Sequence, residues 1–185
     1  TNGLNFRTAT DTFAAQLPQE WQKSRIDVDT LGVAGAYNAL TSAISAGQSV
    51  ISYTGHSAPA QWGFEPLLTA NQVSALPANV NQPVLLQFGC WTTYFLSPVS
   101  QTMGNAWMLS PGRGASAVFG STVLLDQPSH DMVARELATR LRPGVRLGDA
   151  IEQSRTALAD GDDIHSGAEI MIGITLLGDP AMVVR

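Results

Sequence analysis

Two stretches decide the fold of this chain of 185 residues: Val50-Ile51-Ser52-Tyr53-Thr54-Gly55-His56 and Val84-Leu85-Leu86-Gln87-Phe88-Gly89-Cys90. Each starts with an apolar run, which favours a buried β-strand, and ends in a glycine followed by a side chain that can move protons or act as a nucleophile. In open α/β sheets, ligands gather beyond the carboxyl ends of the strands. If the two strands are parallel neighbours, His56 and Cys90 project from one edge of the sheet. We therefore predict that these two side chains serve one site.

The rest of the chain alternates between helical and strand-like patterns. Apolar spacing predicts helices at 11–17, 33–46, 69–76, 104–109, 131–141 and 146–159. Strands are predicted at 25–28, 50–53, 83–88 and 115–119, and an apolar tail at 169–177 ends in the turn Gly178-Asp179-Pro180. This alternation indicates one α/β sandwich over residues 1–185, with a mostly parallel central sheet and helices on both faces.

Composition excludes several classes of protein. Apolar residues make up 44% of the chain and charged residues 14%, with a net charge of −5 and a single lysine, Lys23. The arginines are scattered, so no basic stripe for nucleic acid is present. No apolar run approaches the length of about 20 residues that a membrane span needs. The first residues show neither a signal peptide nor an initiator methionine, which favours a processed start.

The single cysteine restricts the chemistry. It excludes an intrachain disulfide framework and a multi-thiolate zinc site, so Cys90 is either a small buried residue or a working thiol. A free thiol, with a pKa of about 8.5, needs a nearby base such as imidazole to become a strong nucleophile. Gly55 and Gly89 suit tight turns beside the two residues. The N–H groups of Ser57 and Cys90 are candidate donors to an oxyanion.

Four blocks in order resemble the gingipain-type family of cysteine peptidases, in the caspase-like clan. The stretch from Val50 to Ser57, followed by Trp62, resembles the histidine block of that family. The stretch from Val84 to Cys90 resembles its cysteine block. Residues 114–122 are similar to its wall strand, and residues 177–180 to its terminal turn. The resemblance covers about residues 40–185.

The resemblance implies a caspase-like three-layer sandwich and hydrolysis of peptide bonds through a thioester. It implies that His56 is the acid and base and that Cys90 is the nucleophile. A secreted or cell-surface protein is expected, with a peptide or protein as substrate. Residues expected to line the substrate groove are Trp62, Trp91, Ser121 and Thr122.

The same resemblance shows what is missing or different. Family members carry an N-terminal subdomain that helps to form the specificity pocket and supplies a carboxylate to the histidine, so residues 1–185 are expected to form one catalytic subdomain. Asp11, Asp27 and Asp29 are interpreted as solvated or capping residues. Ser57 replaces a glycine of the family, and residues 123–127 lack the tryptophan of its arginine-specific members. The resemblance therefore does not imply a preference for arginine in the substrate.

No cofactor or metal is predicted for the site. Asp160, Asp162 and Asp163 offer oxygen ligands, and gingipain-like proteins often bind calcium, yet the twelve-residue calcium loop is absent. His130 and His165 have no second ligand at a useful spacing. The glycine loop that binds phosphate and the serine-hydrolase elbow are also absent from the sequence.

Three functions remain open. The first is a cysteine endopeptidase that uses Cys90 and His56. The second is a caspase-like module without activity that serves binding or assembly. The third is a thiol-based transpeptidase, in which an amine rather than water resolves the thioester.

Overall fold

The fold is built on a central sheet of four strands. The computed structural model describes residues 5–79, 81–97, 101–160, 167, 170 and 172–184. The strand order is β1 (Val50–Thr54), β5 (Val84–Phe88), β6 (Ala117–Ser121) and β7 (Ile174–Gly178). β1, β5 and β6 are parallel, and β7 pairs antiparallel with β6. The predicted sheet, mostly parallel, is confirmed.

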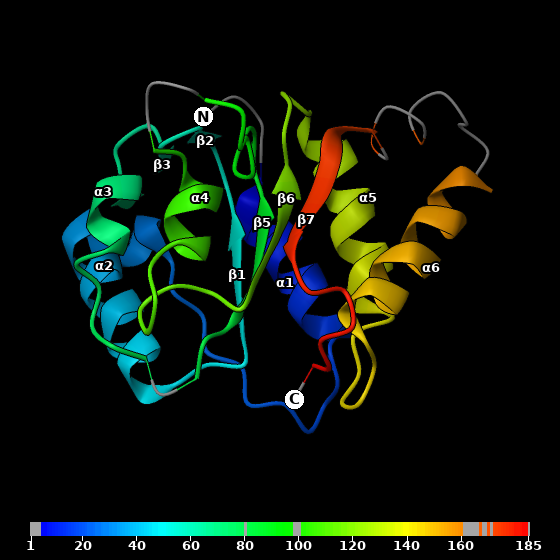
Figure 1. Cartoon of the computed structure of the whole chain (residues 1–185), viewed down its shortest axis with the longest axis horizontal. Helices are drawn as coiled ribbons and strands as arrows, with labels where there is room; N and C mark the ends of the chain where they lie inside the picture. Colours follow the sequence, from blue (N-terminus) through cyan, green and yellow to red (C-terminus); the bar gives the residue numbers. More distant parts are fainter. Residues whose placement is uncertain are drawn as a thin grey trace.

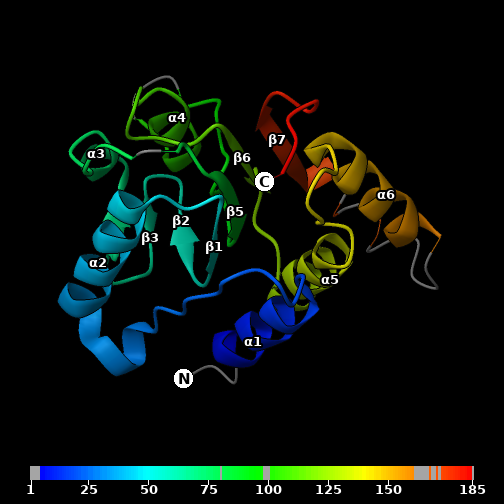
Figure 2. The same ribbon diagram turned by 90° about the horizontal axis from the view of Figure 1, so that it is seen from below.

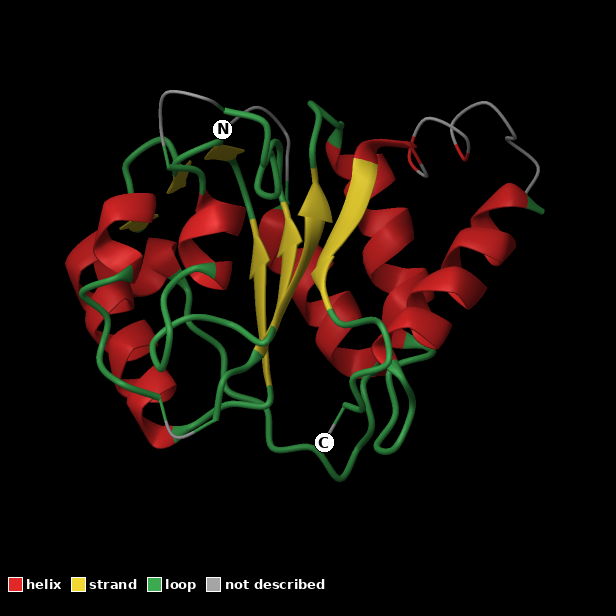
Figure 3. Cartoon of the chain, viewed as in Figure 1, coloured by secondary structure: helices red, strands yellow, loops and turns green. Residues whose placement is uncertain are grey.

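Helices cover both faces of this sheet (Figures 1 and 3). One face carries α2 (Val28–Ala46), α3 (Ala70–Val73) and α4 (Met103–Met108), and the other carries α1 (Phe6–Gln16), α5 (Gln127–Ala138) and α6 (Leu147–Ala159). Figure 2 shows the same two groups from below, on either side of the strands. The three predicted layers are therefore present. Within the described ranges, none of these helices has both the length and the hydrophobicity of a membrane span.

The central strands are buried on both sides, as expected for parallel strands covered by helices. Every residue of β5 and β6 is buried. Successive side chains of β5 enter different cores. Leu86 belongs to the core under α1, α5 and α6, whereas Leu85 belongs to the core under α2, α3 and α4. The edge strand β1 is different, because none of its residues is fully buried and Ser52 is exposed.

A second, smaller sheet follows His56 directly. It consists of β2 (Ser57–Ala58), β3 (Gln61–Trp62) and β4 (Leu68–Thr69), paired antiparallel. The N–H of Gly63 donates to the carbonyl of His56 at 2.7 Å, and the Tyr53 hydroxyl donates to the same oxygen. This sheet therefore fixes the main chain at His56.

The strand predicted at 25–28 is wrong. Residues 22–27 form no strand, and α2 already begins at Val28. The reason is the cap of this helix: the Asp27 carboxylate accepts the N–H groups of Asp29 and Thr30. Asp27 is thus a capping residue, as interpreted from the sequence.

Two other helices begin earlier than predicted. α1 starts at Phe6, because the Asn5 side chain accepts the N–H of Thr8. α5 starts at Gln127, where Asp126 accepts the N–H of Ser129. In both cases a side-chain cap lies upstream of the first periodic apolar residue, where hydrophobic spacing gives no signal.

Candidate active site

His56 and Cys90 follow neighbouring parallel strands at matched positions. Thr54 of β1 is in register with Phe88 of β5, so each functional residue lies two positions beyond a matched pair. In Figure 1 the two strands run side by side and end at the same edge of the sheet. The predicted common edge is therefore present in the structure.

The two turns are also tied to each other. The N–H of Gly55 donates to the Phe88 carbonyl at 3.2 Å, and the Ser57 hydroxyl donates to the Cys90 carbonyl at 2.7 Å. A Cβ on Gly89 would lie 2.6 Å from the Gly55 carbonyl oxygen and would also collide with the Ser57 hydroxyl. Glycine at position 89 thus permits the close approach of the two turns.

The Cys90 thiol points to a neighbouring loop. The side chain is partly exposed, and its Sγ donates to the carbonyl of Leu125 at 3.2 Å. Leu125 belongs to the segment 122–126, which leads from β6 into α5. The contact places the Cys90 side chain against the segment that leads from β6 into α5.

The main chain after Cys90 has an unusual conformation. Trp91 has a φ of 55°, in the left-handed region that non-glycine residues seldom adopt, and its N–H donates to Val123 at 3.1 Å. The N–H of Cys90 has no acceptor among the residues that the structure describes. An unpaired N–H beside a nucleophile is available to a developing oxyanion.

The His56 ring lies between two phenylalanines. Its centroid is 4.2 Å from the Phe64 ring, stacked, and 5.0 Å from the Phe6 ring, edge-on. Across the described residues, the ring nitrogens form no hydrogen bond or ion pair, so no carboxylate supports the histidine within that part of the chain. Asp27 is engaged elsewhere, since it pairs with Arg7 at 2.6 Å and Arg25 at 2.9 Å.

The two tryptophans expected along the groove have different surroundings. Trp62 is 1% exposed, stacks on Tyr53 at 4.5 Å and faces Trp107 at 5.9 Å. It therefore has the contacts of a core residue. Trp91 is partly exposed beside the thiol, and of the two it is the one that a substrate could touch.

Ser121 and Thr122 lie at the end of β6, next to the Cys90 loop. Ser121 is fully buried, and its hydroxyl donates to Val123 at 2.7 Å. Thr122 is partly exposed and donates to the Gly173 carbonyl at 3.1 Å. Both hydroxyls hold the segment that carries the Leu125 carbonyl.

Sequence reasoning missed Gln87, which links the layers below the site. This side chain is fully buried in β5, accepts the Trp62 indole N–H at 2.7 Å and donates to the Thr92 carbonyl at 3.2 Å. The sequence does point to this residue, because Gln87 is the one polar residue in an otherwise apolar strand. A buried polar group requires partners, and here they join β3 to the turn after Cys90.

His130 is a second buried imidazole, at the start of α5. It is 5% exposed, and neither ring nitrogen has a hydrogen-bond partner among the described residues. Burial lowers the pKa of His130 to about 4, against the opposing attraction of Asp126. The ring is therefore neutral at pH 7.

Possible metal ligands do not gather in the part of the chain that the structure describes, where no group of three His, Cys, Asp or Glu residues is found. Asp160 ends α6 and is described. Asp162, Asp163 and His165 lie outside the described residues.

Comparison with solved structures shows which fold this is. No curated protein sequence matches the chain. Its structure is similar to that of the Arg-specific cysteine proteinase gingipain R, with a TM-score of 0.76 and 18% identity over 100% of this chain and 44% of that one. The complex of RgpB pro- and mature domains from Porphyromonas gingivalis is also similar, with a TM-score of 0.75 and 20% identity. This match covers 100% of this chain and 45% of that one. The likeness confirms a caspase-like α/β sandwich.

A third structure, of a protease, gives a TM-score of 0.67 at 18% identity, with 80% of this chain and 38% of that chain covered. The chain thus spans less than half the length of the solved structures that it matches. The sequence profile of peptidase family C25 matches residues 3–185, including the first 40 residues, where the blocks quoted above gave no sign of it. The resemblance inferred from four short blocks is confirmed, and the chain belongs to peptidase family C25.

Proposed function

We propose that this protein is a cysteine endopeptidase in which Cys90 is the nucleophile and His56 is the acid and base. The observation that carries the proposal is the matched position of the two residues beyond β1 and β5, with the Ser57 hydroxyl tying one turn to the other. Membership of a peptidase family supports it. The chain contains no second thiol that could take the role.

The proposed reaction has two halves. His56 accepts the proton of the Cys90 thiol, and the sulfur attacks the scissile carbonyl carbon. The C–N bond then breaks as His56 returns the proton to the leaving amine, which leaves a thioester. Water, deprotonated by His56, attacks the thioester and releases the acid and the free thiol. Neither half requires a metal, so we propose no resident cofactor for these two residues.

The oxyanion of each tetrahedral intermediate needs donors in place before the reaction. We assign the N–H of Cys90 to this role, because it has no acceptor among the described residues. The N–H of Ser57 is the second proposed donor, since Ser57 is fixed beside Cys90 by its own side chain.

In the structure the Cys90 thiol donates to the Leu125 carbonyl at 3.2 Å and not to His56. For catalysis the sulfur must exchange the Leu125 carbonyl for the His56 imidazole. We propose that a bound peptide displaces this contact, and that Trp91 and Thr122 line the path of the peptide. Trp62 and Ser121 are buried, so we assign them no contact with the peptide.

The whole protein is proposed to be longer than this chain. The matched structures are more than twice as long, and one of them contains a pro-domain. We propose that residues 1–185 form the subdomain carrying the nucleophile of a secreted or cell-surface peptidase, and that a further subdomain completes the specificity pocket and supports His56.

Alkylation tests the proposal directly, since Cys90 is the single cysteine. Iodoacetamide should label the native protein at Cys90 and abolish peptide cleavage, and Cys90→Ala should reduce cleavage by at least about 10³-fold. His56→Gln should slow both the labelling at pH 7 and the cleavage. If Cys90→Ala cleaves peptide as fast as the wild type, the proposal is wrong. The matched control is Ser45→Ala, on the exposed side of α2, which should not change the rate of cleavage.

A binding module without activity is the second candidate. The observations that favour it are the unsupported His56 ring and the thiol held by Leu125. It predicts that Cys90 stays unlabelled in native protein of full length. If cleavage is seen instead, product analysis with an added amine separates hydrolysis from transpeptidation, because only the latter yields an amide of the amine.

A further inference from the structure

An exposed phenylalanine lies against the proposed acid and base. The Phe64 side chain is 78% exposed, yet its ring stacks on the His56 imidazole, with 4.2 Å between the ring centroids and 29° between the planes. A single apolar side chain on a surface is common and needs no functional reason. Phe64 is different, because the ring that it contacts belongs to the residue proposed to carry protons.

The turn that carries Phe64 is held in place by several contacts. The N–H of Gly63 donates to the His56 carbonyl at 2.7 Å, and the Gln61 amide donates to the Gly63 carbonyl at 2.8 Å. Gly63 has a φ of 84°, and a Cβ at this position would lie 2.6 Å from a main-chain oxygen of the same turn. The fold therefore presents Phe64 from a tight turn that is bonded to His56 itself.

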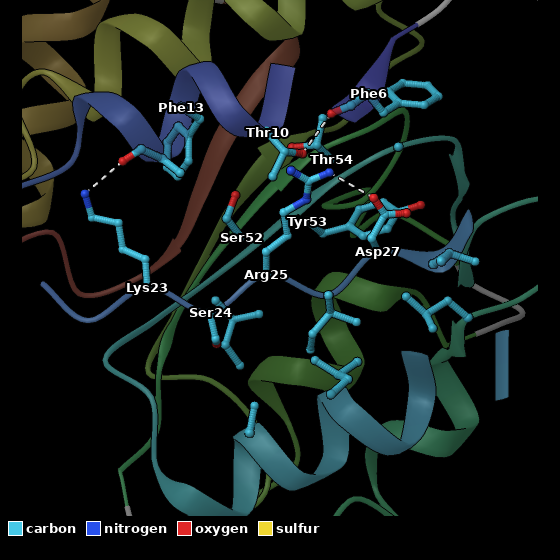
Figure 4. A pocket seen from close by; sticks show the side chains of 18 of the residues that line it. Phe6, Thr10, Phe13, Lys23, Ser24, Arg25, Asp27, Ser52, Tyr53 and Thr54 are labelled. Atoms are coloured by element: carbon cyan, nitrogen blue, oxygen red, sulfur yellow. Dashed lines mark hydrogen bonds and ion pairs between the residues drawn. The ribbon is translucent and has the colours of Figure 1, made fainter. Parts of the chain in front are cut away.

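The main chain of His56 is fixed, whereas its ring depends on aromatic contacts. The Tyr53 hydroxyl donates to the same carbonyl oxygen as the N–H of Gly63, so two donors hold the main chain. Within the described ranges the ring nitrogens form no hydrogen bond, and the ring contacts Phe64 on its face and Phe6 edge-on at 5.0 Å. Figure 4 shows Tyr53 and Phe6 beside the hollow of about 850 Å³ that they line together with Phe64. Neighbouring rings thus set the plane of the imidazole.

A stacked aromatic ring can assist a proton transfer in two ways. It opposes rotation of the imidazole, because rotation would separate the two planes. It also attracts positive charge, since the face of an aromatic ring binds a cation within about 6 Å of its centroid. In the proposed reaction His56 becomes a cation when it takes the proton of Cys90. The contact is therefore stronger after proton transfer than before it, and an interaction of this kind raises kcat rather than lowering KM.

We propose that Phe64 is a positioning residue, which holds the plane of the His56 imidazole and stabilises the imidazolium formed when Cys90 loses its proton. The inference rests on the function proposed above and adds a residue to it. A carboxylate from another part of the protein would act on a ring nitrogen of His56, whereas Phe64 acts on the face of the ring. The two kinds of support are therefore compatible.

Nuclear magnetic resonance of the His56 ring tests the stack in the full-length protein. Protons held over the face of a phenyl ring resonate upfield, and the His56 signal is identified by its loss in His56→Gln. At pH 9, above the ordinary titration range of imidazole, this signal should move downfield in Phe64→Leu, which keeps an apolar side chain but has no ring. Identical signals in the wild type and Phe64→Leu would overturn the inference, because the two rings would then not be stacked.

Steady-state kinetics of the full-length protein test the effect on the reaction. Phe64→Leu should lower kcat about fivefold and leave KM within about twofold of the wild type, because the lost contact is made mainly with the protonated histidine. Phe64→Trp should retain most of kcat, since the indole face attracts a cation more strongly than a phenyl face does. The matched control is Leu109→Ala, which removes a side chain of 72% exposure at the end of α4 and should leave kcat unchanged.

The outcomes distinguish a failure of this inference from a failure of the proposed function. If the wild-type full-length protein cleaves no peptide, the proposed function is wrong, and the inference is wrong with it. If the wild type cleaves peptide and Phe64→Leu has the same kcat, the inference alone is wrong. A higher KM with an unchanged kcat would make Phe64 a residue that binds substrate, which also contradicts a positioning role.

Discussion

At the scale of single residues, the site depends on how closely two turns approach. Gly89 allows the approach, and the Ser57 hydroxyl fixes it through the Cys90 carbonyl. Ser57 stands where the resembled family usually has glycine, so this chain has a link between its turns that a glycine cannot make. The side chain therefore acts as a positioning residue in the proposed reaction.

Ser57→Ala should weaken this link without unfolding the protein. A neutral hydrogen bond contributes about 1 kcal/mol, so we expect kcat/KM to fall about fivefold, mostly in kcat, and the free energy of unfolding to fall by about 1 kcal/mol. Steady-state kinetics and urea denaturation measure both values. Ser57→Thr, which keeps the hydroxyl, should recover most of kcat.

The control for this prediction is Ser45→Ala on α2, whose hydroxyl donates to Thr41 in an exposed position. It should leave both quantities unchanged. If Ser45→Ala and Ser57→Ala behave alike, the link between the turns has no special role.

Residue-level prediction from the sequence succeeded for some groups and failed for others. The positions of His56 and Cys90 just beyond two strands could be predicted, because a glycine after an apolar strand marks the strand end. The hydrogen bond from the Cys90 thiol to the Leu125 carbonyl could not be predicted, because any residue type supplies a carbonyl and the two residues are 35 positions apart. The unsupported state of the His56 ring likewise depends on tertiary structure alone.

At the scale of elements, α5 carries a buried imidazole in its first turn. His130 is neutral in the folded protein because burial lowers its pKa to about 4. In the unfolded chain a histidine titrates near pH 6.5. Between these values the unfolded state binds a proton that the folded state does not, so the stability of the fold falls as the pH falls from 6.5 to 4.

Replacement of His130 by leucine should remove this dependence. In the wild type, this group should lower the free energy of unfolding by up to about 3 kcal/mol between pH 6.5 and pH 4. Denaturant titrations at several pH values should give a flatter profile for His130→Leu in that window and parallel profiles above pH 7. Parallel profiles throughout would show that folding does not lower the pKa of His130.

The boundaries of the helices and strands show where local sequence is sufficient to predict secondary structure. The run of β5, apolar except for Gln87, identifies a strand buried on both faces, and it was predicted correctly. Residues 25–28, in which Ile26 and Val28 alternate with two charged residues, form no strand, because Asp27 caps α2 and Val28 is the first residue of that helix. The starts of α1 and α5 were missed for a different reason, since Asn5 and Asp126 cap them upstream of the apolar spacing.

At the scale of the whole molecule, the sheet separates two cores. Phe13 of α1 is 5% exposed, and its ring lies 5.4 Å from that of Phe88 in β5. On the other side, Trp62 and Trp107 fill the core under α2, α3 and α4. The layer order could be predicted from the alternation of helix and strand, whereas the position of β1 at the edge of the sheet could not, because strand order depends on tertiary pairing.

Phe13→Ala tests how much α1 contributes to the fold. Truncation of a buried phenylalanine should cost about 3 to 5 kcal/mol of unfolding free energy. Phe64→Ala is the matched control, because Phe64 is 78% exposed and should change stability by less than about 0.5 kcal/mol. Thermal and urea denaturation of both variants give the comparison. Equal losses would mean that α1 does not pack on the sheet as described.

The stacked pair of Trp62 and Trp107 gives the protein an internal optical probe. Two indoles held 5.9 Å apart and 24° from parallel in a packed core should give a near-ultraviolet circular dichroism signal that is lost when their packing loosens. Trp62 is also bonded to Gln87, in the strand that leads to Cys90. Spectroscopy without any label can therefore follow the integrity of the scaffold beneath Cys90.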